Sequence, residues 1–224
     1  MILHARRTSY RPAALTALLE RDRTLFEHWT HDAAVIPTAF LPHWTLRHAR
    51  DRERLIRNWA ALRQPGYEAR FAPVLDHVAR HGACRSDSFA APAGQGAKGW
   101  WDWHPSKSAL EYLWRTGALA ISRREGFRKV YDLTERVLPV VDDPPSARDT
   151  LDWACASALE RLGIATPGEL AAFWALATPA EARDWSARQI AQGRLQEVEV
   201  IGADGSARLH LARPESLRSQ PRAS

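Results

Sequence analysis

The sequence is poor in cysteine, lysine and long apolar runs, and each shortage excludes a class of protein. Cys84 and Cys155 are the only cysteines in 224 residues and show no CxxC spacing, so they are predicted to be buried, reduced thiols rather than a disulfide or a zinc site. No stretch approaches the roughly 18 consecutive apolar residues of a membrane-spanning helix. The start, MILHARRTSY, lacks the apolar core of a signal peptide, and a cytoplasmic location is therefore expected.

Lysine is so rare that arginine supplies almost all of the positive charge. Of the 31 cationic side chains, only Lys98, Lys107 and Lys129 are lysines, and the net charge is +5. Arginine suits phosphates and guanine edges, but a composition rich in alanine and arginine also follows from a GC-rich genome. Charge alone therefore leaves nucleic-acid binding open, although the positive surplus falls on residues 1–80.

Histidines and carboxylates do not form a recognisable metal site in the sequence. His28 and His31 lie three residues apart beside Glu27 and Asp32, but no third ligand can be placed at a defined position. We therefore expect neither a metal nor another cofactor.

Residues 100–139 contain the clearest structural pattern. An amphipathic helix is predicted over residues 106–115, and Gly117 suits its end. Two β-prone runs, 119–122 and 127–133, then flank a turn with basic residues. A helix followed directly by a basic hairpin is typical of the second half of a winged helix-turn-helix, in which the helix enters the major groove of duplex DNA.

The predicted DNA contacts are the hydroxyl and cationic side chains of this helix and wing: Ser106, Lys107, Arg123, Arg124, Arg128 and Lys129. Side chains at a helix start and on a wing can hold phosphates. The alternatives are a simple helix cap at Ser106 and a solvated hairpin tip. Trp100, Trp101 and Trp103 are expected to anchor a loop in the core, with base stacking as the alternative.

The same order of elements occurs twice, which predicts a mainly α protein with small β-hairpin wings, built from tandem winged helix-turn-helix modules. Both blocks show a helix, a short helix, a longer helix that ends at glycine, and then a hairpin. Four parts are expected. Residues 1–65 form a helical segment, which is the remnant of a first winged-helix module plus linker helices. A DNA-binding winged-helix domain over 66–141, a second winged-helix domain over 142–212 and a disordered tail over 213–224 follow.

Two helical regions are expected before the first complete module. Residues 10–36 show an apolar stripe at helical spacing and are predicted to form two short helices. A further helix is predicted over residues 47–62, where five arginines alternate with two acids. These arginines fit either a solvated face with ion pairs between successive turns or a contact with the DNA backbone.

Three motifs resemble the bacterial winged-helix DNA glycosylases of the YcaQ/AlkZ type. They are LFEHWTHDAAVIP (25–37), GWWDWHPSKSALEYL (99–113) and VYDLTERVLP (130–139), and the resemblance covers about residues 3–211. It implies tandem winged-helix domains that bind double-stranded DNA and excise alkylated bases or interstrand crosslinks. It also places His31 within a family-like motif, where it is expected to approach the DNA or the active site.

The resemblance also implies a difference in chemistry. Members of that family hold the attacking water with a short Gln-x-Gln or Gln-x-Asp motif, which precedes the region that resembles the start of this sequence. None of the six glutamines here has that spacing. We therefore assign no catalytic residue and expect a truncated, catalytically silent relative of the family. One alternative is a non-catalytic winged-helix DNA-binding protein, such as a transcription regulator. The other is a gene product whose true start lies upstream.

Overall fold

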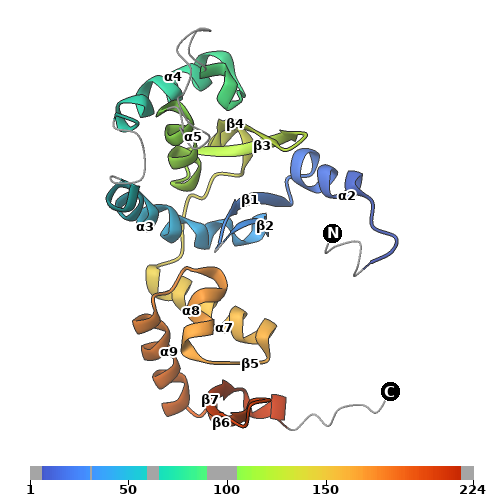
Figure 1. The fold of residues 1–224 in the computed structure, drawn as a ribbon, viewed down its shortest axis with the longest axis vertical. Helices are drawn as coiled ribbons and strands as arrows, with labels where there is room; N and C mark the ends of the chain where they lie inside the picture. The colour runs from blue at the N-terminus through green and yellow to red at the C-terminus, as the bar shows by residue number, and fades with distance from the viewer. Residues whose placement is uncertain (1–6, 31, 60–65, 90–104, 218–224) are drawn as a thin grey trace. The chain divides into compact units, whose positions relative to one another are not determined.

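The structure, a computed structural model, describes residues 7–30, 32–59, 66–89 and 105–217 (Figure 1). The chain divides into two compact units: Met1–Trp29 with Ala33–Pro144, and Thr30–Asp32 with Pro145–Ser224. The predicted segment 1–65 and the predicted domain 66–141 thus fall within one unit. None of the described helices is long and apolar enough to cross a membrane.

The first unit begins with a short helix and a hairpin. Helix α2 (Pro12–Thr16) continues into the π-helical turn η1 (Ala17–Arg21), and strands β1 (Leu25–Trp29) and β2 (Ala33–Pro37) then pair antiparallel along their whole length. The prediction of helix over residues 10–36 is therefore wrong beyond η1. A half-buried strand shows alternating apolar and polar residues, but β1 is buried on both of its faces and lacks this alternation. Three successive side chains are buried: Phe26, Glu27 and His28.

Helix α3 (Leu41–Trp59) follows the 3-10 turn η2 (Thr38–Phe40). It confirms the helix predicted from residue 47 but starts earlier. Pro42 is tolerated there because it lies in the first turn of the helix, where a backbone N–H would have no partner within the helix. Its buried residues recur every three or four positions, as a single helical face requires: Leu41, Trp44, Arg47, Asp51, Leu55 and Trp59.

The rest of the first unit has a winged-helix-like arrangement. Its elements are η3 (Glu68–Arg70), α4 (Phe71–His81), η4 (Ser86–Phe89), α5 (Pro105–Arg115), β3 (Leu119–Glu125), β4 (Arg128–Leu133) and α6 (Thr134–Val137). Strands β3 and β4 form the predicted wing, and Cys84 joins its inner edge through an antiparallel bridge to Tyr131. Figure 1 shows this wing extending toward α2.

The second unit repeats this arrangement. Its elements are α7 (Ala147–Leu162), β5 (Ile164–Ala165), α8 (Pro167–Trp174), α9 (Pro179–Ala191), β6 (Gln196–Ile201), β7 (Ala207–Ala212) and η5 (Pro214–Leu217). Strand β7 lies between β5 and β6. Strand β5, which precedes α8, therefore pairs with β7, just as Cys84 in the first unit pairs with Tyr131 on β4. The predicted fold class, helical modules with small hairpin wings, is confirmed.

Local sequence signals set the helix starts of the second unit. Thr166 and Thr178 each accept a hydrogen bond from the backbone N–H three residues later, and Glu169 and Glu181 complete the two capping boxes. The tail predicted to be disordered from residue 213 instead includes η5, so that prediction is wrong for its first residues; residues 218–224 lie outside the described part.

Candidate nucleic-acid interface

Helix α5 was expected to lie in the major groove, but in the structure it is the central helix of the first unit. It contacts α3, α4, β1 and β3, and eight of its eleven residues are buried: Ser106, Ser108, Ala109, Leu110, Glu111, Tyr112, Leu113 and Trp114. These contacts cover most of the helix surface. Of the two residues predicted at its start, Ser106 is buried whereas Lys107 is exposed, and a contact of this end with DNA stays a prediction.

An array of alternating charges links the tip of the wing to the η4 segment, and we call it the wing network. It consists of Arg123, Glu125, Arg85, Asp87 and Arg128. Along this order the nitrogen–oxygen distances are 2.7, 2.7, 2.8 and 3.2 Å. All five side chains are exposed to solvent by more than a third, and hydrogen bonds from the arginines lower the pKa of both carboxyl groups.

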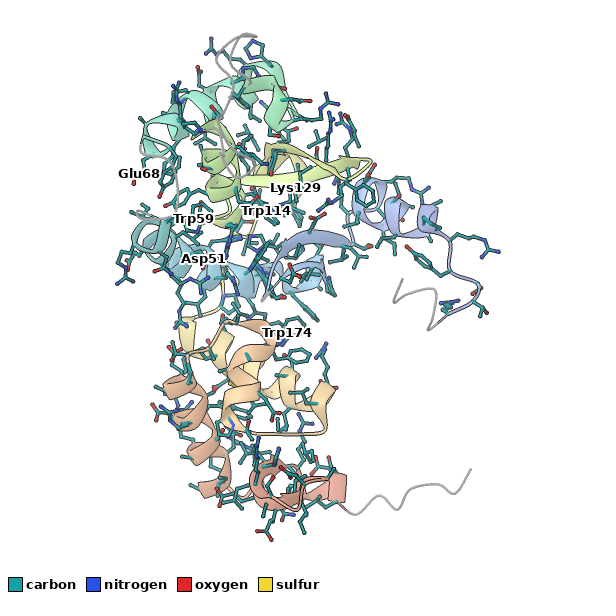
Figure 2. The ribbon with its side chains drawn as sticks, in the orientation of Figure 1. Asp51, Trp59, Glu68, Trp114, Lys129 and Trp174 are labelled. Carbon is teal, nitrogen blue, oxygen red and sulfur yellow. The ribbon has the colours of Figure 1, made fainter. Side chains whose placement is uncertain are left out.

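Arg124 and Lys129 pair with carboxylates outside this network. Arg124 donates two hydrogen bonds to the Glu27 carboxylate, one of them 2.7 Å long from Nε, and these bonds raise the pKa of the guanidinium. Lys129 Nζ lies 3.0 Å from Glu111 Oε2 and 3.6 Å from the centre of the Trp114 ring (Figure 2). Both cations pair with largely buried carboxylates, and their contact with DNA stays a prediction.

The turn of the wing carries an exposed aromatic residue, although the sequence predicts a strand from this position. Phe127 is 98% exposed and follows Gly126, whose φ of +63° makes the turn between β3 and β4. Arg124 Nη1 donates a 2.9 Å hydrogen bond to the Phe127 carbonyl. The tip therefore holds an exposed ring on a backbone that is tied to β1 through Arg124 and Glu27.

A groove of about 310 Å³ lies between the N-terminal helical turn and the wing. Its lining combines apolar, acidic and basic side chains: Leu15, Thr16, Leu19, Glu20, Glu27, Ile121, Ser122, Arg123, Arg124 and Gly126. Its two acids are already engaged, because Glu27 binds the Arg124 guanidinium and Glu20 Oε1 accepts a 3.3 Å hydrogen bond from the Arg124 backbone N–H.

His28, one of the histidines considered for metal binding, is buried between two tryptophans. The indole N–H of Trp44 donates to its Nδ1 at 3.1 Å, and its Nε2 lies 3.2 Å from the Trp114 carbonyl oxygen. This pairing requires a neutral imidazole with the proton on Nε2, and burial lowers the pKa of His28 well below 6.5. No group of three metal-ligating side chains occurs within the described ranges; His31, Trp100, Trp101 and Trp103 lie outside them.

A buried ion cluster joins α3 to α5 below the wing (Asp51 in Figure 2). The carboxylate of Asp51 lies 3.5 Å from Arg47 Nε, 2.5 Å from Arg54 Nη2 and 3.8 Å from Arg115 Nη2. The side chains of Asp51 and Arg47 are each 2% exposed, and burial lowers the pKa of Arg47 to about 10. Arg47 therefore belongs neither to a solvated face nor to a DNA contact, the two interpretations proposed for the arginines of this helix.

A similar chain fold is known. The Streptomyces sahachiroi DNA glycosylase AlkZ superposes with a TM-score of 0.59 at 16% sequence identity. The match covers 89% of this chain and 56% of AlkZ, so the chain spans little more than half the length of that protein. At this identity the likeness establishes the fold alone. The family model described as DNA glycosylase AlkZ-like, however, matches all of residues 1–224, and the chain therefore belongs to the AlkZ-like DNA glycosylase family.

Proposed function

We propose that this protein acts in DNA repair and binds duplex DNA through the exposed tip of its first wing. The wing network supports this proposal most strongly. Its three arginines share two carboxylates, which leaves one positive charge in excess. Each guanidinium has five N–H donors, so an arginine that binds a carboxylate keeps donors for a phosphate. Of the predicted contacts, Arg123 and Arg128 stay in the proposal, together with Lys107.

The ion pairs of the network do not prevent phosphate binding. Exposed pairs of this kind contribute about 0–1 kcal/mol each, so a phosphate can take the place of a carboxylate at little cost. Counterions released from the DNA add a favourable free energy for each phosphate that is neutralised. The network would thus order the arginines before the DNA arrives.

The proposed binding predicts a large loss of affinity when the two outer arginines are removed. In the double variant Arg123→Ala with Arg128→Ala, we expect duplex affinity to fall about tenfold at moderate salt. The measurement is fluorescence anisotropy with a labelled duplex.

The matched control is Arg183→Ala with Arg188→Ala, which removes the same charge from the exposed side of α9 in the second unit. This control should bind as the parent does. If the wing variant binds unchanged, or if only the α9 variant loses affinity, the wing is not the docking surface.

The family resemblance supports a narrower proposal, that the DNA carries alkylated or crosslinked bases. Such a role places the protein in the cytoplasm, the compartment that holds bacterial DNA. Residues 1–224 would hold this DNA without hydrolysing the glycosidic bond themselves, since hydrolysis needs a positioned group that orients water. The sequence has no Gln-x-Gln or Gln-x-Asp motif, and both acids of the groove are engaged with Arg124.

This narrower proposal predicts no base release. Incubation of the 224-residue chain with a duplex that contains N7-methylguanine should release the base no faster than buffer does, while affinity for that duplex exceeds affinity for the undamaged one. Enzymatic release that is lost in Glu27→Gln or Glu20→Gln would contradict catalytic silence and place chemistry in the groove. Equal affinity for both duplexes would favour a winged-helix regulator instead.

A further inference from the structure

Phe127 is the most exposed large apolar side chain in the described part of the chain. Its ring is 98% exposed, so the fold gains nothing from burying it. Single exposed apolar residues are common on protein surfaces and by themselves indicate nothing. Phe127 differs because of where it stands and how it is held.

The backbone beneath the ring is fixed by a chain of hydrogen bonds. Arg124 binds the Phe127 carbonyl at 2.9 Å, and the same guanidinium is held by Glu27 on β1, whose side chain is 8% exposed. On the same strand, β3, Arg123 and Glu125 pair at 2.7 Å. The aromatic ring therefore projects from an ordered tip, which lowers the entropy lost when the ring binds.

The charges around the ring indicate the kind of partner. The wing network beside Phe127 has three arginines and two carboxylates, and Arg128, which directly follows Phe127, has a side chain that is 70% exposed. The second wing offers a contrast, because its exposed Leu209 lies directly opposite Glu199 in the strand register. An apolar side chain among guanidinium groups suits a base stack bordered by phosphates, whereas one beside carboxylates does not.

We propose that Phe127 is a wedge that inserts between adjacent base pairs of the bound duplex while the neighbouring arginines hold the flanking phosphates. This inference rests on the proposed function and extends it from phosphate binding to base contact. Proteins that insert apolar side chains into DNA must unstack a base step. Because a mismatched or damaged step is already weakened, the wedge would favour such sites over undamaged duplex.

The test compares Phe127→Ala and Phe127→Trp with the parent on two duplexes, one fully paired and one with a single mismatch beside 2-aminopurine. We expect the parent to raise 2-aminopurine fluorescence on binding, since the wedge unstacks that base. Phe127→Ala should abolish the rise and weaken binding to the mismatched duplex about tenfold, whereas Phe127→Trp should retain both. Ile201→Ala, which removes an exposed apolar side chain from the second unit, is the control and should behave as the parent does.

The outcomes separate the wedge from the docking surface. If Phe127→Ala leaves fluorescence and affinity unchanged while the Arg123 and Arg128 double variant loses affinity, the wedge is refuted and the proposed function stands. If the parent binds neither duplex, both proposals fail. If Phe127→Ala instead abolishes self-association of the chain in sedimentation, the ring serves a protein contact and the wedge is refuted. Both Phe127 variants should keep the unfolding midpoint of the parent, because the exposed Phe127 ring makes no packing contacts that a substitution could remove.

Discussion

Replacing Asp51 with asparagine is expected to lower the free energy of unfolding by about 3–5 kcal/mol. The substitution keeps the size of the side chain but removes the one negative charge between Arg47, Arg54 and Arg115. Arg47 is 2% exposed, so its guanidinium would remain buried beside two other cations without a compensating anion. A buried charge that loses its partner is far more costly than an exposed one.

Urea unfolding at neutral pH measures this effect, and the chain provides a matched control. Asp76 pairs with Arg80 one turn later on α4, and both side chains are more than half exposed. Asp76→Asn should therefore cost no more than about 1 kcal/mol. Equal stability losses in the two variants would show that the Asp51 cluster is solvated and that its burial does not govern stability.

Acid is expected to destabilise the first unit well before its carboxylates titrate. Burial lowers the pKa of His48 from 6.5 to about 4 and that of His28 well below 6.5. The unfolded chain takes up protons at these histidines as the pH falls through 6.5, whereas the folded chain takes one up at His48 only near pH 4. Stability is therefore complete above pH 6.5 and falls as the pH drops toward 4; His48 alone accounts for about 2–3 kcal/mol between pH 7.5 and 4.5.

Urea midpoints across this pH range give the measurement. His48→Gln should flatten the pH dependence, because it removes one proton-binding site from the unfolded chain. A parent that is as stable at pH 4.5 as at 7.5 would show that the two imidazoles are accessible to protons in the folded state.

The elements that sequence could predict are those fixed by local signals. The helix predicted over residues 106–115 and its end at Gly117, which has a positive φ, follow from preferences of a few neighbouring residues. The hairpin after it was predicted too, although its first strand reaches Glu125 rather than residue 122. Strand β1 was missed, because residues buried on both of its faces leave no alternation to detect. Its apolar spacing matches that of a helix by coincidence.

The candidate site was only partly predictable, for a different reason. The cations of the wing are visible in sequence, but their partners are not: Glu27 precedes Arg124 by 97 residues and Glu111 precedes Lys129 by 18. Tertiary packing alone decides that these two cations pair with Glu27 and Glu111, whereas Arg123 and Arg128 belong to the wing network. The burial of α5 escaped prediction in the same way, since Ser106, Ser108 and Glu111 give that helix a polar side in sequence.

The salt dependence of duplex binding tests the docking of the first wing most directly. Phosphate contacts set the slope of the logarithm of affinity against the logarithm of salt concentration, and each lost contact makes it less steep by about 1. If Arg123 and Arg128 each hold a phosphate, the slope of their double alanine variant is less steep than that of the parent by about 2, while the α9 control retains the parent's slope. Parallel slopes for the parent and the wing variant would contradict the account, because they would mean that these arginines touch no phosphate.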